Sequence, residues 1–175
     1  MKNPPSPPFA KVGKLPPLLN AYVAGGYIIN RLSTYFSTLG FTGYIPFAPG
    51  TFGSAVGFLL VFLLKPDDPT LLYLLTLLFI PGLFASNHSE KSLGKDSKHI
   101  VIDELCGYLL TVLFIPKTMP YLIAAFVLFR FFDILKPPPI KKIEQRLSGG
   151  AGIMFDDLLA AVYANLCIQI WRYFF

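Results

Sequence analysis

Five acidic residues lie at the ends of strongly apolar segments: Asp103, Glu104, Asp133, Asp156 and Asp157. Ionisable side chains beside hydrocarbon are costly and by default mark a functional site. Several carboxylates brought together repel one another unless a cation neutralises them, and hard divalent cations such as Mg²⁺ prefer oxygen ligands. We therefore expect all five residues to be catalytic and to bind Mg²⁺ at a bilayer surface.

Two cationic side chains accompany one of these carboxylates at the end of its apolar segment. Arg130, Asp133 and Lys136 recur at intervals of three residues, so neighbouring members can meet on one helix. They could form only a local ion-pair ladder whose long side chains snorkel to the surface. In an active site, Arg130 and Lys136 would contact a substrate phosphate. Lys136 is the first choice, because its flexible ammonium can meet a terminal phosphate at the surface.

Two glycine-containing motifs precede apolar segments and could donate hydrogen bonds to the same phosphate. Residues 49–54 (PGTFGS) offer the hydroxyls of Thr51 and Ser54, and residues 149–152 (GGAG) offer backbone amides, with Gly150 as the candidate. Free amides at a helix N-terminus attract anions. Each motif could instead be an ordinary helix start, with glycine for close packing.

The composition places these motifs in a membrane protein. The chain has 175 residues, of which 54% are apolar and 14% charged, whereas soluble domains carry about 25% charged residues. Its net charge of +5 suits anionic lipid or an anionic substrate. No nucleic-acid partner is expected, because the basic residues are not interleaved in a polar patch. The length suits one domain.

The elements that must position the motifs are helical. Each of five apolar stretches is shorter than the ~20 residues of a full span, so adjacent turns would continue the helices or the bilayer would thin. They run approximately over residues 51–64, 70–86, 104–116, 119–135 and 157–174. We predict an all-α, multi-helix integral membrane bundle of about five short apolar helices. A soluble helical bundle is the alternative.

The first 40 residues differ from the rest of the chain. Residues 1–16 are rich in proline and lysine, lack the apolar core of a signal peptide, and predict a flexible arm. Residues 17–40 interleave aromatic and polar side chains, which predicts one or two interfacial helices that Gly25 and Gly26 could break. Residues 17–175 would then form one membrane-embedded domain.

The basic residues predict which way the domain faces. If the helices alternate in direction, the N-terminal arm and the loops 87–103 and 136–156 lie on one side. With the adjoining helix ends, that side holds 12 of the 15 basic residues, and the other side holds Lys65, Lys117 and Arg172. The positive-inside rule places the richer side, and with it the acidic motifs, in the cytoplasm.

Taken together, these motifs resemble those of the phosphatidylglycerophosphatase A family. The resemblance covers about residues 45–163 in the right order, and rests on Pro49-Gly50-Thr51 with Gly53-Ser54, Asp103-Glu104 with Gly107, Asp133 with Lys136-Pro137 and Ile140, and Gly149-Gly150 with Gly152-Ile153-Met154, Asp156-Asp157 and Ala160. It implies a multi-pass enzyme of the bacterial inner membrane. Such an enzyme uses Mg²⁺ to convert phosphatidylglycerophosphate to phosphatidylglycerol and phosphate.

The residues themselves leave two chemical routes and two other functions open. The chain lacks a cysteine-phosphatase loop and an Asp-x-Asp pair, and His88 and His99 lack the Ser-Gly-His setting of other lipid phosphatases. Water activated by a carboxylate-bound metal is the first route, and a covalent aspartyl intermediate is the second. A small transporter or ion-coupled subunit with a carboxylate-lined site is an alternative function, although transporter sites lie near the midplane. A scaffold subunit is another.

Overall fold

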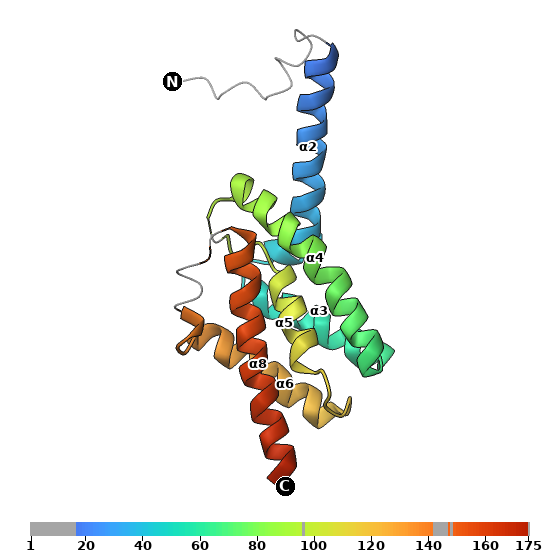
Figure 1. The fold of residues 1–175 in the computed structure, drawn as a ribbon, viewed down its shortest axis with the longest axis vertical. Helices are drawn as coiled ribbons and strands as arrows, with labels where there is room; N and C mark the ends of the chain where they lie inside the picture. The colour runs from blue at the N-terminus through green and yellow to red at the C-terminus, as the bar shows by residue number, and fades with distance from the viewer. Residues whose placement is uncertain (1–16, 96, 142–146, 148, 175) are drawn as a thin grey trace.

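The fold is all-α over the residues that the computed structural model describes, which are 17–95, 97–141, 147 and 149–174. These residues form six α-helices and one short 3-10 helix (Figure 1). In chain order they are α2 (Pro17–Ser37), η1 (Thr42–Tyr44), α3 (Pro49–Leu64), α4 (Asp68–Leu93), α5 (Ile102–Thr111), α6 (Met119–Leu135) and α8 (Gly150–Phe174). The predicted flexible arm, residues 1–16, lies outside the described residues.

Every predicted apolar stretch contains a helix, but two of the helices are longer than predicted. α4 has 26 residues and α8 has 25, because residues assigned to loops, 87–93 for α4 and 150–156 for α8, continue both helices. Asp67 caps the start of α4 by accepting a hydrogen bond from the Thr70 amide at 3.1 Å. Both helices are long and apolar enough to cross a membrane. The prediction of uniformly short helices is therefore wrong for α4 and α8.

The N-terminal region forms one helix and not two. α2 continues through Gly25 and Gly26, so the possibility that these glycines break it is not realised. A Cβ atom at either glycine would meet nothing within 4 Å, which places both glycines on an open surface. α2 projects past the rest of the bundle in Figure 1.

The shortest α-helix of the described chain lies at the centre of the bundle. Eight of the ten residues of α5 are buried, and α5 packs against α3, α4, α6 and α8. The Tyr108 hydroxyl donates to the Leu122 carbonyl at 3.1 Å, and Gly107 allows the Phe129 ring of α6 to approach closely. A charged residue on α5 is therefore surrounded by protein.

The helices run so that their ends collect at two opposite ends of the bundle. The end of α6 and the starts of α3, α5 and α8 meet at what we call the acidic end, where Asp103, Glu104 and Asp157 lie together. At the other end, which we call the hairpin end, Lys117 pairs with Asp68 across the turns that begin α4 and α6. The loops that carry the predicted motifs thus share one end.

The outer surface of the bundle is strongly apolar. Large side chains are exposed along the helices, among them Leu63, Tyr73, Phe84, Val127 and Ile170. Soluble monomers rarely expose continuous apolar surface on this scale. Together with the two long apolar helices, this surface indicates association with a membrane.

Candidate active site

Three of the five predicted carboxylates form one buried group at the acidic end. Asp103 and Glu104 come from the first turn of α5, and Asp157 comes from α8. One carboxylate oxygen from each residue lies within 4.8 Å of the other two. Asp103 is 8% exposed and Asp157 is 3% exposed, so water cannot screen their charges.

The hydrogen bonding of this group fits a cation. Asp103 Oδ1, Glu104 Oε2 and Asp157 Oδ2 are buried and have no hydrogen-bond partner. Nearly all buried polar atoms of native proteins have a partner. Three such carboxylates cannot all be charged unless a positive charge lies among them. Because all three atoms that could coordinate a metal are carboxylate oxygens, these residues suit a hard divalent metal ion.

The segment before α5 explains why two of these carboxylates are buried. Ile100, Val101 and Ile102 are buried apolar residues, and they carry the start of α5 into the core. The Val101 amide donates to the Ser37 carbonyl at 2.9 Å, which ties this segment to the end of α2. Asp103 and Glu104 follow at once, so their burial results from the apolar residues that precede them.

The third carboxylate occupies a core position of α8. The buried face of this helix recurs at intervals of three and four residues, as an amphipathic helix requires, through Gly150, Met154, Asp157, Ala161, Ala164 and Ile168. α8 begins at Gly150, so Asp157 lies beyond the first turn. The helix-start interpretation therefore does not explain Asp157, because the dipole acts mainly on the first turn.

Arg130 connects the acidic group to α6. Its Nη1 atom lies 2.5 Å from Asp133 Oδ2 and 3.9 Å from Glu104 Oε1. Gly50, at the start of α3, lies against the same pair: a Cβ atom there would collide with Glu104 Oε1 and lie 3.1 Å from Arg130 Nη1. A larger residue at position 50 would displace the Glu104 carboxylate, so this glycine lets the start of α3 lie directly against it.

Asp156, the remaining predicted carboxylate, lies in a second ion pair. Asp156 Oδ2 accepts from Lys136 Nζ at 2.5 Å, and Asp156 Oδ1 accepts from the Asp157 amide at 3.1 Å. The Lys136 side chain is 27% exposed and the Arg130 side chain 16%, so Lys136 is the more accessible cation. The structure thus brings all five carboxylates to the acidic end, three as a group and two paired with cations.

The neutral phosphate ligands predicted from the sequence have local structural contacts. The Ser54 hydroxyl is buried and donates to the Gly50 carbonyl at 3.0 Å. A Cβ atom at Gly150 would collide with the Leu83 carbonyl, so this glycine permits α8 to approach α4. Thr51 is half-buried near the start of α3. These contacts supply a packing reason for Ser54 and Gly150, and their contact with phosphate stays a prediction.

Both histidines bind backbone carbonyls. His99 Nδ1 lies 2.7 Å from the Gly43 carbonyl oxygen, and the ring stacks on Tyr44 with 4.8 Å between centroids. His88 Nδ1 lies 2.9 Å from the Phe84 carbonyl oxygen, one turn earlier in α4. Neither histidine belongs to the carboxylate group.

Sequence reasoning missed two contacts that shape the site. It predicted that Arg130 could meet Asp133 on one helix, but not that the guanidinium also lies 3.9 Å from Glu104 Oε1. It also did not foresee that Gly50 lies against Glu104. The motif of residues 49–54 was the only signal for the second contact, and spacing alone cannot identify the residue a glycine faces.

Comparison with known proteins identifies the family. The chain matches the sequence model of phosphatidylglycerophosphatase A over residues 35–172, which include all five carboxylates. It belongs to the phosphatidylglycerophosphatase A family. The resemblance found in the motifs is thereby confirmed, and the protein is a lipid phosphatase. The transporter and scaffold alternatives are not supported.

Three curated relatives agree with this assignment at the level of lipid phosphatases. Phosphatidylglycerophosphatase A of Haemophilus influenzae is 41% identical over 137 residues, covering 74% of this chain and 84% of the relative. The Escherichia coli protein of the same name is 35% identical over 129 residues, covering 69% and 72%. A Bacteroides thetaiotaomicron relative, provisionally named a phosphatidylinositol-3-phosphatase, is 37% identical over 141 residues, covering 75% and 88%. No solved structure matches the chain significantly.

Proposed function

We propose that the protein hydrolyses phosphatidylglycerophosphate to phosphatidylglycerol and inorganic phosphate, using Mg²⁺ bound by Asp103, Glu104 and Asp157. The observation that carries this proposal is the group of three unpartnered carboxylate oxygens at one end of an apolar bundle. Family membership supports the lipid substrate, because two of the relatives are named for this activity.

Of the two chemical routes that the sequence leaves open, we propose direct attack by water over a covalent aspartyl intermediate. A bound Mg²⁺ ion would supply Lewis-acid neutralisation of the phosphate charge and would lower the pKa of water. A water oxygen forms the new bond to phosphorus, the bond between phosphorus and the glycerol oxygen breaks, and a proton from the water ends on that oxygen. Asp103, Glu104 and Asp157 would hold the ion, and their burial limits the access of bulk water.

Arg130 and Lys136 supply the positive charge that the terminal phosphate needs. Asp133 and Asp156, which the sequence also predicts as metal ligands, are paired with these two cations. We assign Asp133 to orient Arg130 between α5 and α6, and Asp156 to hold Lys136 beside the carboxylate group. Lys136 is the more exposed cation and is our choice for direct phosphate contact.

The decisive assay is phosphate release from phosphatidylglycerophosphate in detergent micelles. We expect turnover to stop in EDTA and to return with added Mg²⁺. Phosphatidylinositol 3-phosphate and glycerol 3-phosphate should be turned over more slowly in the same assay. Full activity in EDTA would overturn the metal mechanism, and a higher kcat/KM for phosphatidylinositol 3-phosphate would overturn the substrate.

We further place the protein in the bacterial inner membrane as a multi-pass protein, with the acidic end in the cytoplasm. The excess of basic residues on that side supports this orientation. Cysteines introduced at Lys91 and Thr70, both exposed, test it in a Cys167→Ser background, since Cys167 is the exposed native cysteine. A membrane-impermeant thiol reagent should label position 70 but not position 91 in spheroplasts. Labelling of both from outside would refute the orientation.

A further inference from the structure

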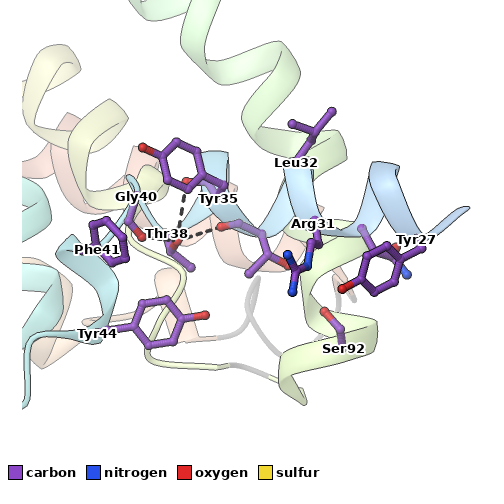
Figure 2. A pocket seen from close by; sticks show the side chains of 11 residues that line it. Tyr27, Arg31, Leu32, Tyr35, Thr38, Gly40, Phe41, Tyr44 and Ser92 are labelled. Atoms are coloured by element: carbon purple, nitrogen blue, oxygen red, sulfur yellow. Dashed lines mark hydrogen bonds between the residues drawn. The ribbon is translucent and has the colours of Figure 1, made fainter. Parts of the chain in front are cut away.

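A cavity lies apart from the three carboxylates of the candidate active site. It has a volume of about 720 Å³ and is bounded by α2, η1 and the last turns of α4 (Figure 2). Its polar lining residues include Asn30, Arg31, Thr34, Tyr44 and Ser92. None of the five carboxylates of the proposed active site lines it. The function proposed above therefore does not use this cavity.

The charge of the cavity favours an anion. Among the residues that the structure describes, no acidic side chain lines it and none forms an ion pair with the Arg31 guanidinium. Arg31 lies over the Tyr27 ring, 5.0 Å from its centroid, and Figure 2 shows Arg31, Ser92 and Tyr44 around a common space. Arginine is the side chain best suited to bind a phosphate through two donors.

The apolar part of the lining favours a lipid over a soluble anion. Leu32, Tyr35 and Phe41 line the cavity and are strongly exposed, Phe41 at 83%. Phe47, shortly after η1, is equally exposed. Exposed aromatic residues beside a cationic site are typical of the membrane interface, where rings lie at headgroup depth. A soluble phosphate would gain nothing from this apolar rim.

We propose that the cavity binds the headgroup of an anionic phospholipid of the surrounding bilayer, with its phosphate on Arg31 and its acyl chains along the rim formed by Leu32, Tyr35 and Phe41. This lipid is distinct from the one that is hydrolysed.

The cavity wall is joined to the segment that leads into the active site. Tyr44 stacks on His99, and the Val101 amide donates to the Ser37 carbonyl beside the lining residue Thr38. A lipid in the cavity would therefore hold α2 and the acidic end of the bundle at the bilayer interface.

Lipid binding to the purified full-length protein tests this proposal. Native mass spectrometry would compare phosphatidylserine, which is neither the proposed substrate nor its product, with phosphatidylcholine of the same chains. We expect the wild type to prefer phosphatidylserine by about fivefold or more, because that is the gain in affinity that one basic residue provides at an anionic surface. Arg31→Gln should bring the two lipids to near parity. Lys65→Gln, which removes an exposed charge outside the cavity, should keep the preference.

A second variant fills the cavity and leaves the arginine in place. Ser92→Trp introduces a large ring at the wall supplied by α4, and should abolish the preference while the melting temperature stays near that of the wild type. If both variants keep the wild-type preference, the proposal is wrong. It is also wrong if glycerol 3-phosphate displaces the lipid at equal concentration, because the site would then bind free phosphate.

Turnover in detergent micelles separates this proposal from the proposed function. Arg31→Gln should release phosphate from micellar substrate at the wild-type rate, because Arg31 is outside the carboxylate group. A loss of turnover that parallels the loss of lipid binding would show that the cavity belongs to the substrate site, and would overturn a separate lipid site. Failure of the hydrolysis assay for the wild type would instead concern the proposed function alone.

Discussion

The polar side chains at the two ends of the bundle differ in how completely they are partnered. At the hairpin end, Lys117 Nζ lies 2.6 Å from Asp68 Oδ1, and donates to the carbonyls of Val112 at 2.8 Å and Ile115 at 2.9 Å. Asp68 Oδ1 also accepts from the Phe114 amide at 2.9 Å. One ion pair thus fixes the turn that follows α5 to the start of α4.

α8 completes the hydrogen bonding at the hairpin end. Asn165 donates from Nδ2 to the carbonyls of Thr111 and Leu113, both at 2.8 Å, and Arg172 donates to the Phe114 carbonyl at 3.2 Å. The last carbonyls of a helix have no partner within the helix. Side chains from α8 supply partners here, which is how a purely structural helix end is expected to look.

At the acidic end, by contrast, buried carboxylates of α5 and α8 have oxygens without hydrogen-bond partners. Asp103, Glu104 and Asp157 each retain such an atom, although Arg130 lies 3.9 Å from the other Glu104 oxygen and Lys136 pairs with Asp156. An unpartnered buried charge lowers stability, and proteins tolerate this mainly at functional sites. The polar residues of the hairpin end are thus partnered within the fold, whereas the three carboxylates of the acidic end could bind a metal ion.

The largest expected effect comes from neutralising one member of the carboxylate group. Asp157→Asn should lower phosphate release roughly thousandfold or more, because a lost metal ligand removes several kcal/mol of transition-state stabilisation. Its melting temperature without metal should equal or exceed that of the wild type, since repulsion within the group is relieved. Phosphate release and thermal unfolding of the same preparation measure both.

The control for this variant uses the metal itself. At a hundredfold excess over Kd, Mg²⁺ should stabilise the folded wild type by about 2.7 kcal/mol and so raise its melting temperature. The melting temperature of Asp157→Asn should stay nearly unchanged. Near wild-type activity in Asp157→Asn and in Asp103→Asn would contradict the site assignment.

A smaller loss is expected when the support of Glu104 is disturbed. Gly50→Ala places a methyl group against Glu104 Oε1 and close to Arg130 Nη1. A displacement of about 1 Å in an active site can cost about a hundredfold in rate, so we expect a loss of that order in kcat/KM. Gly25→Ala is the matched control, because nothing lies within 4 Å of its added Cβ atom. Equal activity in the two variants would show that Gly50 does not affect the position of Glu104 during catalysis.

At the hairpin end, the expected change is in stability and not in rate. Lys117→Met removes the ion pair with Asp68 and the donors to two carbonyls, and should lower the free energy of unfolding by about 1–3 kcal/mol. Turnover per folded molecule should be unchanged. Denaturant unfolding in detergent, with phosphate release at low temperature, measures both. A stable variant with reduced turnover would refute the division between the two ends.

The smallest expected effect concerns the exposed cation of the acidic end. Lys136→Ala should lower kcat/KM roughly tenfold and keep the dependence on Mg²⁺, because one charge-assisted contact to phosphate is lost. If Lys136 only stabilised the C-terminus of α6, the change would cost about 1 kcal/mol of stability or less and would leave turnover at the wild-type level. A stable Lys136→Ala variant with wild-type kcat/KM would show that Lys136 has no role in phosphate binding.

The sequence by itself determined the helical class, the apolar character and the residues with catalytic potential. Apolar runs, proline-bounded turns such as residues 65–69, and acidic residues beside hydrocarbon are local features, so they can be recognised without knowing how the helices pack. The motif combination also identified the family that comparison confirmed. The lengths of α4 and α8 escaped this reasoning, because neither the polar residues 87–93 nor the glycine-rich residues 150–152 show by themselves where a helix begins or ends.

Only the tertiary structure decided which carboxylates act together. Asp103 and Asp157 are 54 residues apart in the chain, and their meeting depends on how α5 and α8 cross. The same holds for Gly50 against Glu104, and for the cavity around Arg31. Local propensity acts over a few residues along the chain, whereas these contacts arise from packing the apolar faces of separate helices. Their geometry is therefore a property of the assembled bundle.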